Sequence, residues 1–296
     1  MHNCGFIIKC VAGVYDVLME DNSICSAYAA GKFRNQNVTP LVGDKVALKL
    51  SERENEKNLI TEIFSRKNAL VRPPVANVDT LLITLAVKKP NPDLKLADYL
   101  ICYCRLLDIE PIVLINKSDY DLSAAQKLAQ QFILSGVRAF VTQGSLPDGA
   151  EKLKDVINEG ITCFSGQSAV GKSTLTNLLL GRQMFQTGGL SKKTERGRHT
   201  TRHSEIVEFA KGKWLADTPG FSLLEMPELS PEQFKELYFE YSEYAGDCRF
   251  NGCNHIHEPD CAVKQAVEEN KLSKQRYDRY VELFEEIKEK WRKRYD

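Results

Sequence analysis

The sequence predicts a protein of three parts: a small β-barrel, a central α/β nucleotide-binding domain and a mainly helical C-terminal domain that holds a metal. Short β-like runs separated by Gly, Asn and Asp fill residues 6–64. Apolar runs then alternate with helical stretches around a glycine-rich loop, as in a doubly wound sheet. Near the C-terminus, cysteines and histidines cluster between two helix-like segments, "SPEQFKELYFEYSEYA" at residues 230–245 and "KLSKQRYDRYVELFEEIKEKWRKR". Ser230 makes a good start for the first segment, with Gln233 in position for a capping box.

Length and composition set the limits of this interpretation. A chain of 296 residues with 43% hydrophobic content can bury the cores of two or three domains. Forty basic residues balance forty acidic ones, so nucleic-acid binding would need local patches of charge. No apolar run reaches the roughly 18 residues needed to cross a bilayer, and the cytoplasm is the expected location. Nine cysteines in such a chain should be reduced, which favours metal binding over disulfides where they cluster.

The first part reads as a five-stranded barrel. The expected strands are "FIIKC", "VYDVLM", "SICSAY", "DKVALKL" and "LITEIF". After them, "VRPPVANVD" at residues 71–79 reads as a linker that its two prolines hold extended.

The middle of the chain reads as a covered sheet with helices between its strands. Several runs are almost continuously apolar, as in a sheet packed on both faces. The expected strands are "DTLLITLAV", "PIVLINK", "RAFVTQ", "ITCFSG", "SEIVEF" and "KWLADT", and the first expected helices are "LKLADYLICYCRLL" and "SAAQKLAQQFIL".

The stretch "SGQSAVGKST" at residues 165–174 has the spacing of a phosphate-binding loop, between an expected strand and an expected helix. Gly166 and Gly171 would let backbone N–H groups face phosphate oxygens, Lys172 would reach the β and γ phosphates, and Ser173 would ligate Mg²⁺. The alternative is a glycine-rich turn. The expected nucleotide contacts are Ser165, Gly166, Gln167, Ser168, Ala169, Val170, Gly171, Lys172, Ser173 and Thr174.

The tetrapeptide "NKSD", formed by Asn116, Lys117, Ser118 and Asp119, follows the apolar strand "PIVLI". A carboxylate at Asp119 can accept two parallel hydrogen bonds from guanine, whereas adenine offers no such pair of donors. Asn116 would tie this turn to the phosphate loop, and the Lys117 stem would cover the base. The motif favours GTP over ATP.

Two further loops would sense the γ-phosphate. In "DTPG", Asp217 would hold Mg²⁺ through water, and the N–H of Gly220 would contact the γ-phosphate. In the basic loop at residues 188–203, Thr201 is the expected cap of Mg²⁺ and the γ-phosphate, with Thr200 as the alternative. An ordinary solvated basic loop would carry the same composition.

The residue after Gly220 is Phe221, which cannot orient an attacking water. Intrinsic hydrolysis should therefore be slow until another group aligns that water. His199, in the basic loop, is the expected catalytic candidate together with Thr201 and Lys172. An exposed histidine without a catalytic role fits the sequence equally well.

The order of these motifs is unusual, because the base-reading turn precedes the phosphate loop by about fifty residues. The full set is that of a GTPase cut between its third and fourth motifs and rejoined. A fold tolerates this change when its original termini lie close together and the cut falls in a surface connection. The sequence therefore predicts a circularly permuted GTPase.

The C-terminal cluster "CRFNGCNHIHEPDC" offers three thiols and an imidazole within fourteen residues. This set satisfies a closed, tetrahedral and structural Zn²⁺ site. The expected ligands are Cys248, Cys253, His255 and Cys261, with His257 as the alternative to His255.

Together these motifs resemble the RsgA family, bacterial GTPases that depend on the small ribosomal subunit. The resemblance also includes "GKFR" and "PLVGDKV" in the barrel, "RKNALVRPPVANVD" at the junction and "GRHTT" in the basic loop. It implies an N-terminal OB-fold at residues 1–68, a circularly permuted P-loop GTPase domain at 69–220 and a helical zinc-binding domain at 221–296. It further implies action on the 16S rRNA and nearby proteins of the 30S subunit in late maturation, with hydrolysis stimulated by the subunit. We expect a monomer without a membrane partner.

Two other classes of function are compatible with parts of the sequence. An RNA-binding scaffold would bind GTP in a purely structural site and would not hydrolyse it. A small-molecule kinase would use the same phosphate loop. However, "NKSD" prefers guanine, and the sequence shows no pattern for a pocket that would bind the phosphate-accepting substrate.

Overall fold

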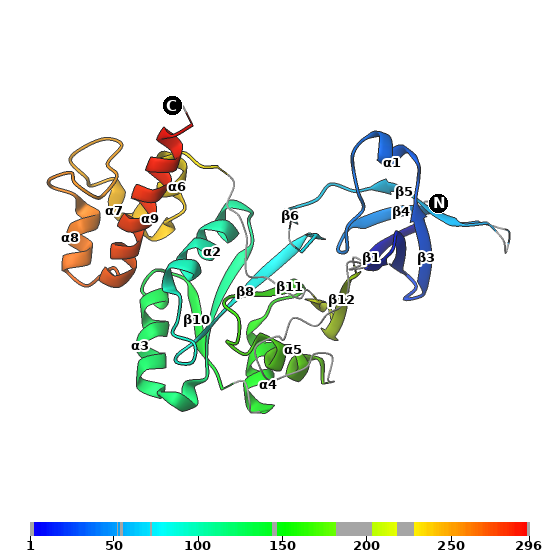
Figure 1. The fold of residues 1–296 in the computed structure, drawn as a ribbon, viewed down its shortest axis with the longest axis horizontal. Helices are drawn as coiled ribbons and strands as arrows, with labels where there is room; N and C mark the ends of the chain where they lie inside the picture. Colours follow the sequence, from blue (N-terminus) through cyan, green and yellow to red (C-terminus); the bar gives the residue numbers. More distant parts are fainter. Residues whose placement is uncertain are drawn as a thin grey trace. The chain divides into compact units, whose positions relative to one another are not determined.

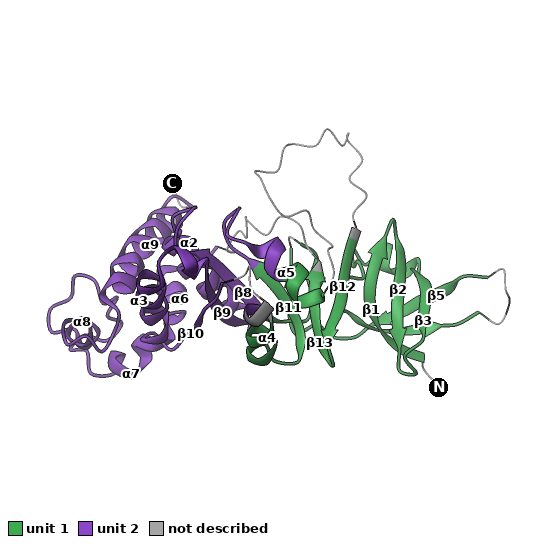
Figure 2. Ribbon diagram, turned by 90° about the horizontal axis from the view of Figure 1, so that it is seen from below, with its two compact units in different colours: residues 1–80, 151–164, 176–223 green, residues 81–150, 165–175, 224–296 purple. Residues whose placement is uncertain are grey.

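The computed structural model describes residues 3–51, 53, 56–71, 73–143, 147–181, 203–217 and 228–294. For residues 147, 148, 150, 203 and 217 it describes the backbone alone. The chain divides into two compact units: residues 1–80, 151–164 and 176–223 form the first, and residues 81–150, 165–175 and 224–296 form the second (Figure 2).

A closed five-stranded barrel begins the first unit. Its strand order is β1-β2-β3-β5-β4, and β4 pairs back onto β1. All neighbours are antiparallel except β3 and β5, which are parallel. This is the connectivity of an OB-fold. The bounds are β1 Asn3–Val11, β2 Val14–Met19, β3 Ile24–Ala29, helix α1 Lys32–Asn35, β4 Lys45–Lys49 and β5 Asn58–Ile63.

Apolar side chains at alternating strand positions fill the barrel. Ile7, Val17, Ala27, Val46 and Ile60 come from the five different strands, and all are fully buried. The two-residue period of a strand puts their neighbours on the outer surface. All five strands expected from the sequence are confirmed.

The segment after the barrel differs from the expected extended linker. β6 (Ala69–Leu70) and β7 (Val75–Ala76) pair as a short antiparallel hairpin, so Pro73 and Pro74 lie in a turn. Within this junction, the side chain of Asn68 exchanges two hydrogen bonds with the backbone of Val78, at 2.8 and 2.9 Å. The prolines bend the chain here because their fixed φ also suits turns.

A second group of strands completes the first unit. β12 (His203–Ala210) pairs antiparallel with β13 (Lys213–Asp217), which lies parallel to β11 (Gly160–Ser165). β12 also pairs with the end of β1, where Lys9 lies opposite Glu205 and their charged groups are 3.3 Å apart. The barrel strands and these strands therefore belong to one hydrogen-bonded sheet. Helix α4 spans Pro147–Val156, and its residues from 151 onward belong to this unit.

Three layers make up the second unit (Figure 1). The first layer consists of strands β8 (Val78–Ala86), β9 (Glu110–Asn116) and β10 (Arg138–Val141), with β9 and β10 parallel. The part of β8 from Leu81 onward belongs to this unit. Helices α2 (Leu94–Leu106) and α3 (Leu122–Ile133) pack between these strands and helix α9. The two helices begin at N-caps Asp93 and Asp121, whose carboxylates accept backbone N–H groups of the first turn.

The C-terminal helices form the third layer. The sequence predicts helical structure throughout residues 230–245. In the structure, Tyr238 has a non-helical backbone conformation, so this segment is divided into shorter helices. Tyr238 and Tyr241 instead turn inward, where their rings pack around Tyr280. The bounds are α6 Pro231–Glu236, η2 Phe239–Tyr241, α7 Ser242–Ala245, α8 Ala262–Glu268 and α9 Lys274–Arg292. The expected capping box between Ser230 and Gln233 is confirmed.

Buried charges link this third layer to α2. Arg276 of α9 is 1% exposed, and its guanidinium lies 2.8 Å from Glu240 and 3.7 Å from Asp98. Arg279 donates to Asp98 as well, and Arg105 of α2 reaches Glu240 at 3.0 Å. Removing one partner from such a network leaves an uncompensated buried charge. These ion pairs therefore fix α9 against α2.

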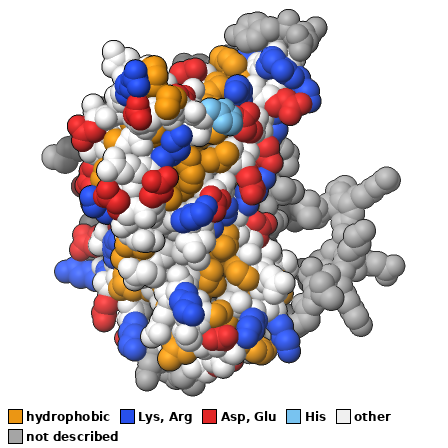
Figure 3. Space-filling view, turned by 90° about the vertical axis from the view of Figure 1, so that its left-hand side faces the viewer, with side chains coloured by type: hydrophobic (Ala, Val, Ile, Leu, Met, Phe, Trp, Pro, Cys, Tyr) orange, Lys and Arg blue, Asp and Glu red, His pale blue; other side chains and the backbone are white. Residues whose placement is uncertain are grey.

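On the surface, seen from the side of the C-terminal helices, basic and acidic side chains are interspersed with apolar ones (Figure 3). Among the described residues, no helix combines the length and apolar character needed to span a bilayer.

Candidate nucleotide and metal sites

The phosphate loop lies between β11 and α5 (Lys172–Leu180). Gly166 has φ +123° and Gly171 has φ +104°, values that favour glycine. A Cβ at Gly166 would lie 2.2 Å from the carbonyl oxygen of Thr84, and one at Gly171 would lie 2.3 Å from the side-chain nitrogen of Asn116. Both glycines are therefore required by local conformation and by close packing.

Lys172 closes this loop on itself. Its amine donates to the carbonyl oxygens of Gly166 and Gln167, at 2.6 and 2.5 Å. Burial lowers the pKa of Lys172 to about 8. Because the loop precedes a helix N-terminus, its N–H groups and the helix dipole both favour an anion. Ser168 and Ser173 are exposed, so their hydroxyls are accessible.

The base-reading turn is hydrogen-bonded to the phosphate loop, although fifty residues separate them. Asn116 ends β9 and is buried, and its amide donates to the carbonyl oxygen of Val170 at 2.9 Å. Lys117 adopts the left-handed conformation, and its amine donates to the carbonyl oxygen of Ala169 at 2.7 Å. Asp119 is exposed within η1 (Ser118–Tyr120). The fold thus brings both motifs to one place, although their order in the sequence is permuted.

Two neighbouring segments were not singled out in the sequence. In the loop after β8, the carbonyl oxygen of Lys89 accepts from Lys117, and the N–H of Asp93 donates to the Gln167 side chain at 3.0 Å. After β10, the carbonyl oxygen of Thr142 accepts from the N–H of Ser118 at 3.4 Å. The signal was present, because the carboxyl ends of neighbouring parallel strands meet at one edge of a sheet.

Other expected site residues lie outside the described part of the chain. These are His199, Thr200, Thr201, Gly220 and Phe221. For Asp217 the structure describes only the backbone, which ends β13 as expected.

The cysteine–histidine cluster is assembled between α7 and α8. The ligand atoms of Cys248, Cys253, His255 and Cys261 all lie within 4.8 Å of one another. Cys248 Sγ is 3.9 Å from Cys261 Sγ, and His255 Nδ1 lies 3.6 and 3.4 Å from these two sulfurs. A tetrahedral ion with Zn–S bonds of about 2.3 Å requires S–S edges of about 3.8 Å. The four residues fit such an ion.

Of the two candidate histidines, the structure brings His255 to the cluster. His257 is 83% exposed at its side chain and points to Glu285. Burial, with a contribution from Lys235, lowers the pKa of His255 to about 4, so its imidazole is neutral near pH 7. Burial also raises the pKa of Cys253 to about 12, which means that without a cation its thiol stays protonated. A divalent metal ion would compensate the thiolate charge.

Polar side chains hold the backbone around this cluster. Glu258 accepts backbone N–H groups from Asn254, Ile256 and His257 at 2.9, 3.1 and 3.2 Å. Partial burial opposes its ionisation, but these hydrogen bonds outweigh that effect and lower the pKa of Glu258 to about 2. Tyr277 donates to the carbonyl oxygen of His255 at 2.7 Å. Such outer contacts orient the residues that bind a metal.

The chain matches two family models over its first three quarters and several proteins along nearly its whole length. The RsgA N-terminal domain model covers residues 4–57, and the RsgA GTPase model covers residues 63–227. A "Small ribosomal subunit biogenesis GTPase RsgA" from Caldanaerobacter subterraneus subsp. tengcongensis is 42% identical, with 98% of each chain covered. Its counterpart from Ruminiclostridium cellulolyticum is 38% identical, with 96% of this chain and 94% of that one covered.

Comparison with solved structures supports the same family. The chain is similar to YloQ, a circularly permuted GTPase, with a TM-score of 0.81, 32% identity and coverage of 98% of this chain and 96% of that one. It is also similar to YjeQ from Thermotoga maritima, with a TM-score of 0.79, 30% identity and coverage of 97% and 99%. The expected fold class of barrel, permuted GTPase domain and helical region with a cysteine–histidine cluster is thereby confirmed. The chain therefore belongs to the RsgA GTPase family and is a GTP-hydrolysing enzyme with circularly permuted motifs.

Proposed function

We propose that this GTPase is an assembly factor that acts in late maturation of the 30S ribosomal subunit and hydrolyses GTP faster when it is bound to that subunit. The observation that carries this proposal is the junction of the phosphate loop and the base-reading turn through Asn116 and Lys117. It occurs in a chain that matches relatives named for small-subunit biogenesis along 98% and 94% of their length.

In the proposed nucleotide complex, Asp119 accepts two hydrogen bonds from guanine and the Lys117 stem covers the base. Backbone N–H groups of residues 166–174 surround the phosphates, and Lys172 transfers its hydrogen bonds from the loop carbonyls to the β and γ phosphates. Ser173 and Thr201 are the proposed ligands of Mg²⁺. This ion would neutralise charge on the phosphates.

Residues beyond the described ranges and the side chain of Asp217 complete the proposed site. Asp217 and Gly220 contact the Mg²⁺ shell and the γ-phosphate, and Thr200 replaces Thr201 if the loop register differs. His199 aligns the attacking water, a task that Phe221 cannot perform.

The cysteine–histidine cluster is proposed to hold one structural Zn²⁺ through Cys248, Cys253, His255 and Cys261. Four protein ligands leave no open coordination position, so the ion would stabilise the C-terminal helices and take no part in hydrolysis. The proposed partners are 16S rRNA and nearby proteins, contacted by a monomer in the cytoplasm.

Turnover measured with and without purified 30S subunits tests the proposed function. We expect slow intrinsic GTP hydrolysis and a large increase with subunits, whereas His199→Ala should bind subunits and lose the increase. A protein that binds GTP but shows the same slow turnover in both conditions would instead be a scaffold with a structural nucleotide site.

Nucleotide state should also control affinity for the subunit. We expect a non-hydrolysable GTP analogue to tighten binding relative to GDP by about 1–3 kcal/mol, and the subunit to tighten analogue binding equally. Both affinities must be measured at one salt concentration, since phosphate contacts depend on salt. Equal affinities for the two states would refute a nucleotide-driven cycle.

A further inference from the structure

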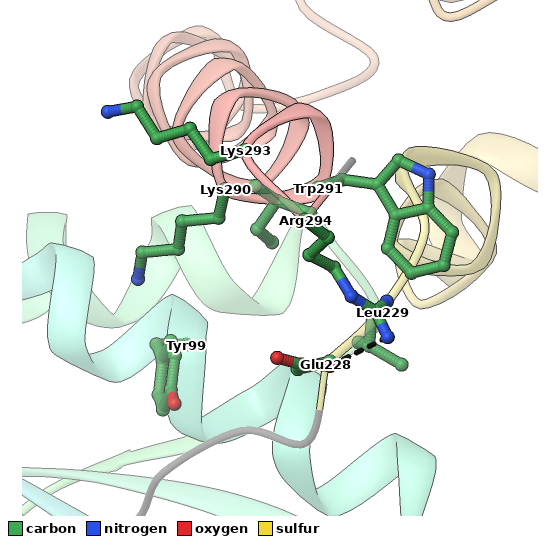
Figure 4. A pocket seen from close by; sticks show the side chains of 8 residues that line it. Tyr99, Glu228, Leu229, Lys290, Trp291, Lys293 and Arg294 are labelled. Atoms are coloured by element: carbon green, nitrogen blue, oxygen red, sulfur yellow. Dashed lines mark ion pairs between the residues drawn. The ribbon is translucent and has the colours of Figure 1, made fainter. Parts of the chain in front are cut away.

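A pocket lies at the end of α9. The described residues that line this pocket include none of the phosphate loop or of the cysteine–histidine cluster. Its volume is about 360 Å³, within the range of roughly 300–1,000 Å³ found for small-molecule sites. Residues of α2, the segment before α6 and the last turns of α9 line it (Figure 4). Leu229 and Ile287 provide apolar surface, and Tyr99 provides an aromatic ring.

A planar cation forms one side of this pocket. The guanidinium of Arg294 lies over the Trp291 ring, 4.4 Å from its centroid. Glu228 fixes that guanidinium through an ion pair of 2.8 Å, drawn as a dashed line in Figure 4. Arginine planes and aromatic rings are the surfaces on which proteins stack the bases of single-stranded RNA. The Arg294–Trp291 pair is such a surface.

The charges at the rim favour an anionic group beside that surface. Lys290 and Lys293 join Arg294 in the lining. Glu289 neutralises Lys293 at 2.8 Å, and Glu228 neutralises Arg294. Lys290 is exposed and, within the part of the chain that the structure describes, forms no salt bridge. Its ammonium group is therefore the cation available to a ligand.

We propose that this pocket binds one unpaired nucleotide of RNA, with the base stacked on the Arg294–Trp291 pair and a phosphate beside Lys290. A nucleotide combines a planar ring with an adjacent anion, which matches the two features of the pocket. This assignment rests on the proposed ribosomal function, because the RNA of the small subunit would supply the nucleotide.

Binding of a labelled, short single-stranded oligoadenylate to the full chain tests this assignment, at one fixed salt concentration. Trp291→Ala and Lys290→Gln should each raise the Kd at least about fivefold. Lys290→Gln should also lower the salt dependence by about one phosphate contact. Lys288→Gln is the matched control, because Lys288 lies on the same helix, is exposed and pairs with Glu285 outside the pocket. It should leave the Kd within about twofold.

Two outcomes would overturn the assignment. In the first, Lys290→Gln and Lys288→Gln bind oligoadenylate equally; because Lys290 is exposed, this comparison holds even if Trp291→Ala fails to fold. In the second, an oligoglutamate peptide displaces the RNA at equal or lower concentration, which would indicate a protein partner. Subunit-stimulated hydrolysis is measured on the same samples. If stimulation is absent from the unaltered chain, the proposed function fails, and if only the variant effects are absent, the pocket assignment fails.

Discussion

Asn116→Ala should weaken both the fold and GTP binding, because one side-chain amide joins the two nucleotide motifs. The change removes the 2.9 Å hydrogen bond to the carbonyl oxygen of Val170, a residue that is fully buried. A lost hydrogen bond costs about 1 kcal/mol, and a buried acceptor left without a donor costs about 1–3 kcal/mol. We therefore expect a loss of about 2 kcal/mol in the free energy of unfolding.

The same energy should appear in nucleotide affinity, because the phosphate loop loses the contact that positions it before GTP arrives. About 2 kcal/mol corresponds to a roughly thirtyfold higher Kd for GTP. Thermal unfolding and titration with a fluorescent GTP analogue measure the two effects, with Asn35→Ala as the control, since Asn35 is exposed in α1. If the unfolding midpoint falls while the Kd is unchanged, the bond serves the fold alone and the reasoning about preorganisation is wrong.

Three further predictions follow from the two sites. Asp119→Asn should shift preference from guanine to xanthine nucleotides, as measured by competition, and unchanged GTP affinity without a gain for xanthine would refute the base assignment. The pKa of Lys172 is lowered to about 8 in the nucleotide-free protein, whereas phosphates favour its charged form. Binding of GTP should therefore take up almost no proton at pH 7 and about three quarters of a proton at pH 8.5, by calorimetry in two buffers; no uptake at the higher pH would contradict the shift. Purified, reduced protein should contain about one equivalent of Zn²⁺, and Cys253→Ser should lose it together with the structure of the C-terminal helices. Metal analysis of the unaltered protein that finds no zinc would remove the proposed ion.

Local patterns in the sequence were sufficient to predict the barrel strands, the sheet strands and the positions of both nucleotide motifs. Strands and turns are set over a few residues: Asn116 follows an unbroken apolar run, and Gly166 begins a loop with fixed spacing. The same local reasoning placed the N-cap of α6 at Ser230, which the structure confirms.

Features that depend on distant partners were not predictable in this way. Pro73 and Pro74 suit an extended chain as well as a turn, and burial of the neighbouring Val75 is consistent with a turn. Nothing near Gln167 indicates that its side chain accepts from Asp93, seventy-four residues earlier. The helix expected at residues 230–245 is divided because Tyr238 packs into a core formed with Tyr280. In each case tertiary packing decides between two local conformations of similar energy.

Helix α2 has a consequence for how the parts of this protein can be separated in the laboratory. Its N-cap residue Asp93 contacts the phosphate loop, while Cys102 on its other side belongs to the apolar core of the C-terminal helices. Cutting the chain before residue 228 would uncover that apolar side and strip Asp98 of both Arg276 and Arg279. A truncated GTPase domain should therefore aggregate or lose nucleotide affinity for reasons unrelated to any partner. Point substitutions on exposed residues of α9, in the intact chain, are the sounder way to assign a role to the C-terminal helices.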